Sequence, residues 1–108
     1  MTADPLVLPR RLAIQILHAA QLAAPASSRG WVSNDGLRYR DGEPAGDPAP
    51  WARCFSKPTS AAEPEPSELV GDGLHLVISL NTKGVLEMRG WTLSTTEGLR
   101  ERPLAIED

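Results

Sequence analysis

Three side chains in the stretch ARCFSK, residues 52–57, are of types that can do chemistry: Cys54, Ser56 and Lys57. A thiol or a hydroxyl acts as a nucleophile when a base lies beside it and a third group orients that base. No histidine lies near this stretch in the sequence, and apolar and aromatic residues lie on both sides of Cys54. We therefore interpret Cys54 as a small buried residue of a strand. A non-zinc enzyme that uses Cys54 or Ser56 as its nucleophile stays the alternative.

The chain has two histidines, His18 and His75. A zinc site needs several His, Cys, Asp or Glu ligands, and neither histidine has a second ligand at a helical i+4 or tight-loop spacing. We interpret His18 as a surface residue of a helix and His75 as a surface or edge residue of a strand. The sequence therefore predicts no bound metal and no cofactor.

Length and charge exclude several classes of protein. The 108 residues suit one domain, residues 1–108, with a single modest core. With 11 Lys and Arg against 14 Asp and Glu, the chain lacks the basic field that selects nucleic acid or an anionic membrane surface. A single cysteine forms no intramolecular disulfide, and no stretch reaches the ~20 apolar residues of a membrane span or reads as a secretory signal. We expect a cytoplasmic protein that binds neither nucleic acid nor membrane.

The first element that must position these residues is a helix in LPRRLAIQILHAAQLAA, residues 8–24. Leu12, Ile16 and Ala20 recur at a helical spacing and predict one apolar face. Pro9 suits a first helical turn, and Pro25 ends the helix because proline lacks the N–H that a helix needs.

Two hairpins follow the helix. RGWVSNDGLRYR, residues 29–40, places an Asn-Asp-Gly turn between two short strands, and LHLVISLNTKGVLEMRGWTL, residues 74–93, alternates in its first half before the turn NTKG. The second strand of the later hairpin carries apolar residues on both faces, so we expect both faces to be covered. Residues 41–50 and 58–73 are predicted loops, and a last strand is expected in residues 101–106, with residues 107–108 frayed. The predicted fold is α+β, a single small domain whose N-terminal helix packs on a mostly antiparallel sheet.

Three parts of the chain together resemble a bacterial JAMM/MPN (JAB) domain, a family of zinc peptidases. They are the first helix ending near RGWV, the segment of residues 51–69 and the hairpin of residues 74–93. The resemblance covers nearly the whole chain in order. It implies a shortened JAMM/MPN fold that lacks an internal strand and helix, because only residues 31–50 separate the first helix from the segment.

The resemblance also implies where the family's functional residues fall. In active members a Glu after the first helix is the general base, a His-Ser-His-Pro run gives two zinc ligands, and a Ser and an Asp follow. Phenylalanine and protonated lysine offer zinc no lone pair, so the matched positions imply a catalytically inactive protein whose vestigial cleft is a partner-binding site. These positions are Ser27 for the general base, Phe55, Ser56, Lys57 and Pro58 for the run, and Glu65 and Glu68 for the later pair.

Two arrangements of this vestigial cleft follow. In the first, Lys57 takes the place of the zinc ion and pairs with Glu68, which holds the loop against the sheet. In the second, both side chains are solvated and Phe55 fills the cleft. The resemblance implies a binding or scaffold module for the tail of a ubiquitin-like or sulfur-carrier protein, or for an active JAMM/MPN protein. A structural remnant that acts only through self-association, such as a homo-oligomer, is the other alternative.

Overall fold

The computed structural model describes most of the chain. The described residues are 6–24, 26–33, 35, 38–42, 50–57, 62–65, 67, 69, 73–80, 87–94 and 98–107. Within them lie one helix, α1 (Arg10–Ala23), and eight strands. The strands are β1 (Leu6–Pro9), β2 (Arg29–Val32), β3 (Tyr39–Asp41), β4 (Ala52–Lys57), β5 (Leu74–Ser79), β6 (Glu87–Ser94), β7 (Gly98–Arg102) and β8 (Leu104–Glu107).

The helix α1 forms in the segment that the apolar spacing predicts, but it begins at Arg10, because Leu8 and Pro9 belong to β1. Pro9 is its N-cap residue with φ −58°, and the buried side chains Leu12, Ala13, Ile16 and Ala20 form its inward stripe. Because these apolar residues lie on one face of α1, its polar residues lie on the opposite face, away from the sheet. No helix in the described ranges is long and apolar enough to cross a membrane.

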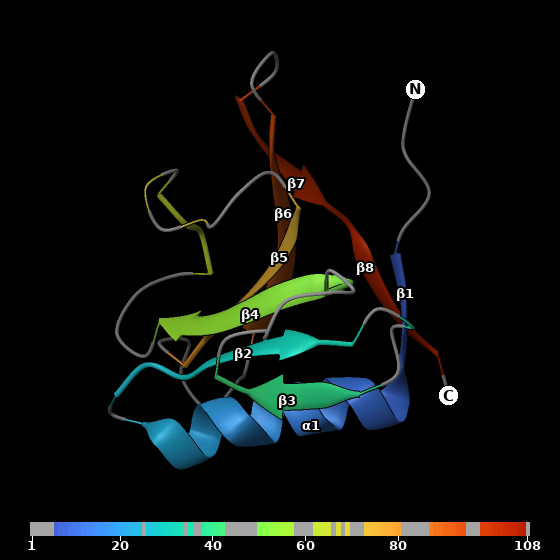
Figure 1. The fold of residues 1–108 in the computed structure, drawn as a ribbon, viewed down its shortest axis with the longest axis vertical. Coiled ribbons are helices and arrows are strands. Elements are labelled where there is room, and N and C mark those ends of the chain that lie inside the picture. Colours follow the sequence, from blue (N-terminus) through green and yellow to red (C-terminus); the bar gives the residue numbers. More distant parts are fainter. Residues whose placement is uncertain are drawn as a thin grey trace.

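The strands form a mixed sheet of six in the order β3-β2-β4-β5-β6-β7. Only β4 and β5 pair in parallel, and the other neighbours in this sheet are antiparallel. After Pro103 the chain continues from β7 into β8, which pairs in parallel with β1 in a second, two-stranded sheet (Figure 1). The fold is therefore a single small α+β domain with one described helix and a mixed, mostly antiparallel set of strands.

The two faces of the six-stranded sheet are covered by different parts of the chain. The helix covers the first face (Figure 1). Ala62 and Leu69, from the segment that joins β4 to β5, cover the second face, which we call the crossover face. The expectation that both faces are covered is confirmed. The buried residues of the helix side are Leu8, Leu12, Ile16, Ala20, Val32, Ala52, Cys54, Leu76 and Ile78, and those of the crossover face are Phe55, Ala62, Leu69, Val77 and Trp91.

Both predicted hairpins are confirmed in their described strands. In the first, Val32 pairs with Tyr39, and in the second, Ser79 pairs with Glu87. Met88 packs on the helix side whereas Trp91 and Leu93 pack on the crossover face, so the second strand carries apolar residues on both faces, as predicted. The turn residues 34, 36–37 and 81–86, and residues 43–49 of the predicted 41–50 loop, lie outside the described residues.

Several expectations about single elements are wrong. His75 is neither a surface nor an edge residue, because it is 1% exposed on β5, between β4 and β6. The expected last strand of residues 101–106 is divided, because Pro103 separates the end of β7 from β8, and Glu107 is not frayed, since β8 extends to it and pairs with Pro9 of β1. The loop was predicted to begin at Asp41, but Asp41 belongs to β3, so the predicted start is one residue too early. The strand β1 was not expected, because its four residues carry no local turn or alternation signal.

Candidate functional site

Two serines connect the segment after α1 to the end of β4. The backbone N–H of Ser28 donates to Ser56 Oγ at 2.7 Å, and the backbone N–H of Ser56 donates to the Ser28 carbonyl oxygen at 3.2 Å. Ser56 is 1% exposed, while Ser27 is exposed one residue before Ser28. The sequence-predicted positions around residues 27 and 56 therefore lie side by side, although they are about 28 residues apart in the chain.

Lys57 and Phe55, on the crossover face of β4, both contact the segment between β4 and β5. Lys57 Nζ donates to the backbone carbonyl oxygen of Glu63 at 2.9 Å. Phe55 is buried with Ala62, Leu69, Val77 and Trp91. The predicted pairing of Lys57 with Glu68 cannot be placed, because Pro58 and Glu68 lie outside the described residues; Glu65 is described and exposed. A lysine whose ammonium donates to a carbonyl and a buried phenylalanine do not fit a zinc ion.

A second group of contacts, around Arg89 of β6, was not foreseen from the sequence. Arg89 Nε donates to Glu101 Oε2 at 2.8 Å, and its other nitrogens contact Glu101 Oε1 and, at 3.1 Å, Glu63 Oε1. The hydrogen bonds from Arg89 lower the pKa of the Glu101 carboxyl from its ordinary value. The guanidinium also stacks over the Trp91 ring, 4.9 Å from the ring centroid. Arg89 therefore links β7 and β6 to the segment that joins β4 to β5, which we call the crossover segment.

The alternative nucleophiles are both buried. Burial raises the pKa of the Cys54 thiol, because the charged thiolate loses its hydration away from water. The thiol therefore stays protonated at neutral pH, and thiolate is the reactive form. The Ser56 hydroxyl accepts the N–H of Ser28 in a site that water does not reach. Neither side chain is presented to a substrate in this structure.

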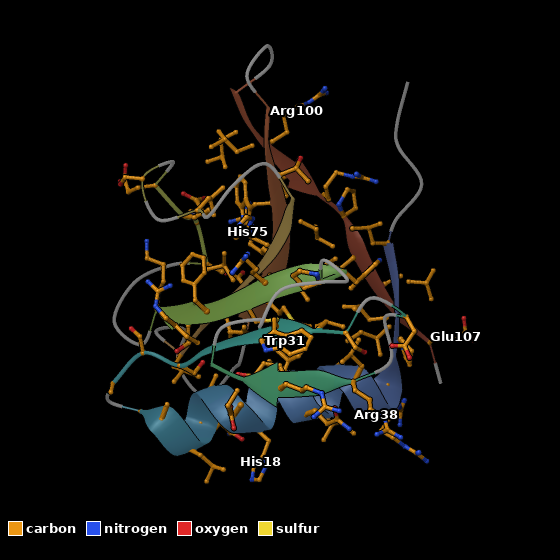
Figure 2. The ribbon with its side chains drawn as sticks, viewed as in Figure 1. His18, Trp31, Arg38, His75, Arg100 and Glu107 are labelled. Carbon is orange, nitrogen blue, oxygen red and sulfur yellow. The ribbon has the colours of Figure 1, made fainter. Side chains whose placement is uncertain are left out.

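The histidines lie apart from each other. Figure 2 shows His18 projecting from α1 away from the sheet, and His75 further up on β5. His75 Nδ1 lies 2.8 Å from the Gly73 carbonyl oxygen, the geometry of an N–H donated to that oxygen. Across the part of the chain that the structure describes, no three His, Cys, Asp or Glu side chains gather closely enough to hold a metal ion.

Two depressions adjoin between α1 and the edge strand β3, and together we call them the α1–β3 groove. One of them, which we call the apolar end after Ala19, Leu22 and Ala23, has a volume of about 480 Å³ and is also lined by Ser28, the residue bonded to Ser56. Leu22 lies in this end and is 74% exposed. The residues lining this end are Gln15, His18, Ala19, Leu22, Ala23, Ser28, Arg29, Tyr39 and Asp41.

The other end of the α1–β3 groove is basic. It is a depression of about 750 Å³ lined by Pro9, Arg11, Gln15, Arg38, Tyr39 and Arg40. Gln15 and Tyr39 line both ends, and the Tyr39 backbone N–H donates to Gln15 Oε1 at 3.1 Å. Burial, with a smaller effect of Asp41, raises the pKa of the Tyr39 phenol, which therefore stays neutral. The phenol packs against Gly30, where any Cβ would overlap the ring.

Comparison with known proteins gives a fold but no family. No family model matches the chain, and no curated protein matches it. Among solved structures, the chain is similar to the solution structure of protein DSY2949 from Desulfitobacterium hafniense, a structural genomics target. The TM-score is 0.71 at 14% sequence identity, over 95% of this chain and 93% of that one. A likeness at this identity shows a shared fold along nearly the whole of both chains.

Proposed function

We propose that this protein is a catalytically inactive JAMM/MPN-like binding module that holds the extended tail of a small ubiquitin-like or sulfur-carrier protein in the α1–β3 groove. The observation that carries the proposal is the pair of hydrogen bonds between Ser28 and Ser56. An active member of the family needs its general base, which follows the first helix, beside its ligand run. The corresponding segments are adjacent here, yet they carry serines and a lysine.

The residue types at this junction support binding over catalysis. Ser27 and Ser28 offer no carboxylate to take a proton from water. The ammonium group of Lys57 donates a hydrogen bond to the backbone carbonyl oxygen of Glu63. The buried thiol of Cys54 does not supply an alternative nucleophile. What remains next to the junction is an open groove with exposed apolar surface, which suits recognition of a peptide.

The shape of the groove favours a thin extended ligand. One wall is α1 and the other is the edge strand β3, and an edge strand can pair with an incoming chain. The N–H of Tyr39 is already taken by Gln15, so strand pairing is blocked at that residue. Side-chain contacts to Leu22 and Ala19 therefore supply the affinity at the apolar end.

The test is a titration of the ¹⁵N-labelled protein with a purified bacterial sulfur carrier of the ubiquitin fold, followed by NMR. We expect the carrier with its intact C-terminal tail to shift resonances of residues around Leu22 and Ser28, and a carrier without its last residues to shift none. Leu22→Asp should weaken binding about tenfold, because a carboxylate then replaces an apolar contact in the groove. Ile14→Asp is the matched control, since Ile14 is 58% exposed on the same helix but lines a different depression.

Two results would refute the proposed function. One is equal binding of the intact and the shortened carrier, which would place the contact on the body of the carrier. The other is an equal loss of affinity in Leu22→Asp and Ile14→Asp, which would place the contact outside the α1–β3 groove.

A further inference from the structure

The basic end of the α1–β3 groove concentrates positive charge in an acidic protein. Arg11 lies in α1, Arg40 lies in β3 and Arg38 directly precedes β3. All three are exposed. Figure 2 shows Arg38 beside the N-terminal end of α1. None of the three forms an ion pair with a described residue, while the whole chain carries a net charge of −3. We call these residues the arginine cluster.

The chemistry of the arginine cluster selects an anion. Guanidinium groups bind carboxylates and phosphates through paired N–H donors, and three of them on two facing elements can serve at least two anionic groups. The first turn of α1 contains no acidic residue that would compete for these donors. The Gln15 side chain and the neutral Tyr39 phenol line the same depression and add no negative charge.

The two ends of the groove adjoin at Gln15 and Tyr39, and their separation along α1 distinguishes between a compact anion and an extended chain. Arg11 and Leu22 lie eleven positions apart on α1, which corresponds to about 17 Å along the helix axis. An extended peptide covers that length with about five residues. A compact phosphate compound would occupy the arginine cluster alone, whereas a peptide contacts both ends, which share Gln15 and Tyr39.

We propose that the arginine cluster makes the α1–β3 groove selective for acidic peptides: the bound segment has two or more Asp or Glu side chains at the cluster and an apolar side chain about five residues away at Leu22. This inference rests on the proposed function, because it specifies the partner segment that the groove accepts. It adds that the partner is chosen by carboxylates as well as by shape.

The experiment uses two synthetic peptides with blocked ends. The first has two glutamates, four alternating glycine and serine residues and one leucine, and the second has glutamines in place of the glutamates. Each is titrated into the ¹⁵N-labelled protein at low salt and followed by NMR. We expect the glutamate peptide to bind about tenfold more tightly, and 0.5 M NaCl to abolish most of this difference, because exposed ion pairs are screened.

Matched variants locate the effect. Arg11→Gln should raise the Kd of the glutamate peptide about threefold, the size expected for one exposed ion pair. Arg10→Gln changes the net charge by the same amount. Because Arg10 lines a separate depression with Ile14 and Ile106, this variant should leave the Kd unchanged. Leu22→Asp should weaken both peptides, because both place a leucine at the apolar end.

Four outcomes would overturn the inference. Equal binding of the two peptides, with both weakened by Leu22→Asp, would leave the groove as a binding site and remove its selectivity for acids. Equal effects of Arg11→Gln and Arg10→Gln would indicate only a general charge effect. An unchanged Kd of the glutamate peptide in Leu22→Asp would show that the arginine cluster acts without the groove. Absence of any shift with either peptide would also refute it, while the sulfur-carrier titration separately decides the proposed function.

Discussion

The indole N–H of Trp91 donates to the backbone carbonyl oxygen of Ala62, 3.0 Å away, and both residues are buried. This bond attaches β6 to the segment that carries the chain from β4 to β5. That segment lies on the crossover face in the place where many sheets carry a helix, so its backbone polar groups need partners from the sheet. Trp91 and Lys57 donate to backbone carbonyl oxygens of this segment, and Arg89 contacts the side-chain carboxylate of Glu63.

The first prediction concerns this attachment. Trp91→Phe keeps an aromatic ring but removes the N–H, which leaves the Ala62 carbonyl oxygen buried without its donor. We expect the free energy of unfolding to fall by about 1–3 kcal/mol, measured by urea denaturation. Trp31→Phe is the control, because Trp31 is half-buried and makes no side-chain hydrogen bond with a described residue. Equal losses in the two variants would show that ring size, and not the hydrogen bond, decides the stability.

The second prediction tests the serine junction of the candidate site. Ser56→Ala removes the acceptor of the Ser28 N–H, and we expect a loss of about 1–2 kcal/mol in the free energy of unfolding. The exposed Ser27→Ala should change it by less than about 0.5 kcal/mol. If Ser56→Ala is as stable as the unmodified protein, the two segments are held together by other contacts and the junction has no structural role.

The third prediction concerns the thiol of Cys54. Because burial raises its pKa and closes it off from solvent, we expect iodoacetamide to label the folded protein at pH 8 far more slowly than the urea-unfolded protein. Mass spectrometry of timed samples gives both rates. Labelling of the folded protein at the rate of the unfolded one would make Cys54 accessible and would restore it as a candidate nucleophile.

The fourth prediction is a pH dependence carried by Glu101. Its folded pKa is lowered, so the contribution of its carboxylate to stability is present above the unfolded pKa and is lost as the pH falls through the folded pKa. We expect Glu101→Gln to be less stable than the unmodified protein by about 0.5 kcal/mol at pH 7, a value suited to an exposed ion pair. This difference should shrink towards zero below the ordinary carboxyl pKa of about 4.

The control for this experiment is Glu107→Gln, which removes one negative charge from an exposed residue of β8 that forms no ion pair with a described residue. Thermal unfolding is followed for the three proteins between pH 7 and pH 3. A difference for Glu101→Gln that stays constant across this range would contradict the prediction, because it would not depend on ionisation of the carboxyl group.

The elements with strong local signals could be predicted from the sequence. The helix has a 3.6-residue apolar period with prolines at both ends, and each hairpin has a turn sequence between alternating residues. The strand β1 and its partner β8 could not be predicted as a pair, because they meet through parallel pairing between distant segments and no turn joins them. His75 was misplaced because alternation identifies the two faces of a strand but not what covers the second face.

The candidate site was predictable only in part. The resemblance brings residues around 27 and 56 together, and the structure places Ser28 against Ser56. The contacts of Arg89 with Glu63 and Glu101 depend on where the crossover segment folds back, which no local pattern encodes. The α1–β3 groove has one faint signal in the sequence, since Leu22 lies off the apolar stripe of the helix, and the arginine cluster becomes visible only when β3 lies beside α1.

The pairing of β1 with β8 bears on how fast the chain folds. Leu6 is aligned with Leu104, about a hundred positions further along, so this ladder closes nearly the largest loop that the chain can form. Contacts of such high sequence separation slow folding, whereas the hairpin of β5 and β6 closes over a few residues. We therefore expect the hairpin to form early, and the β1–β8 ladder to form last and to open first in amide exchange.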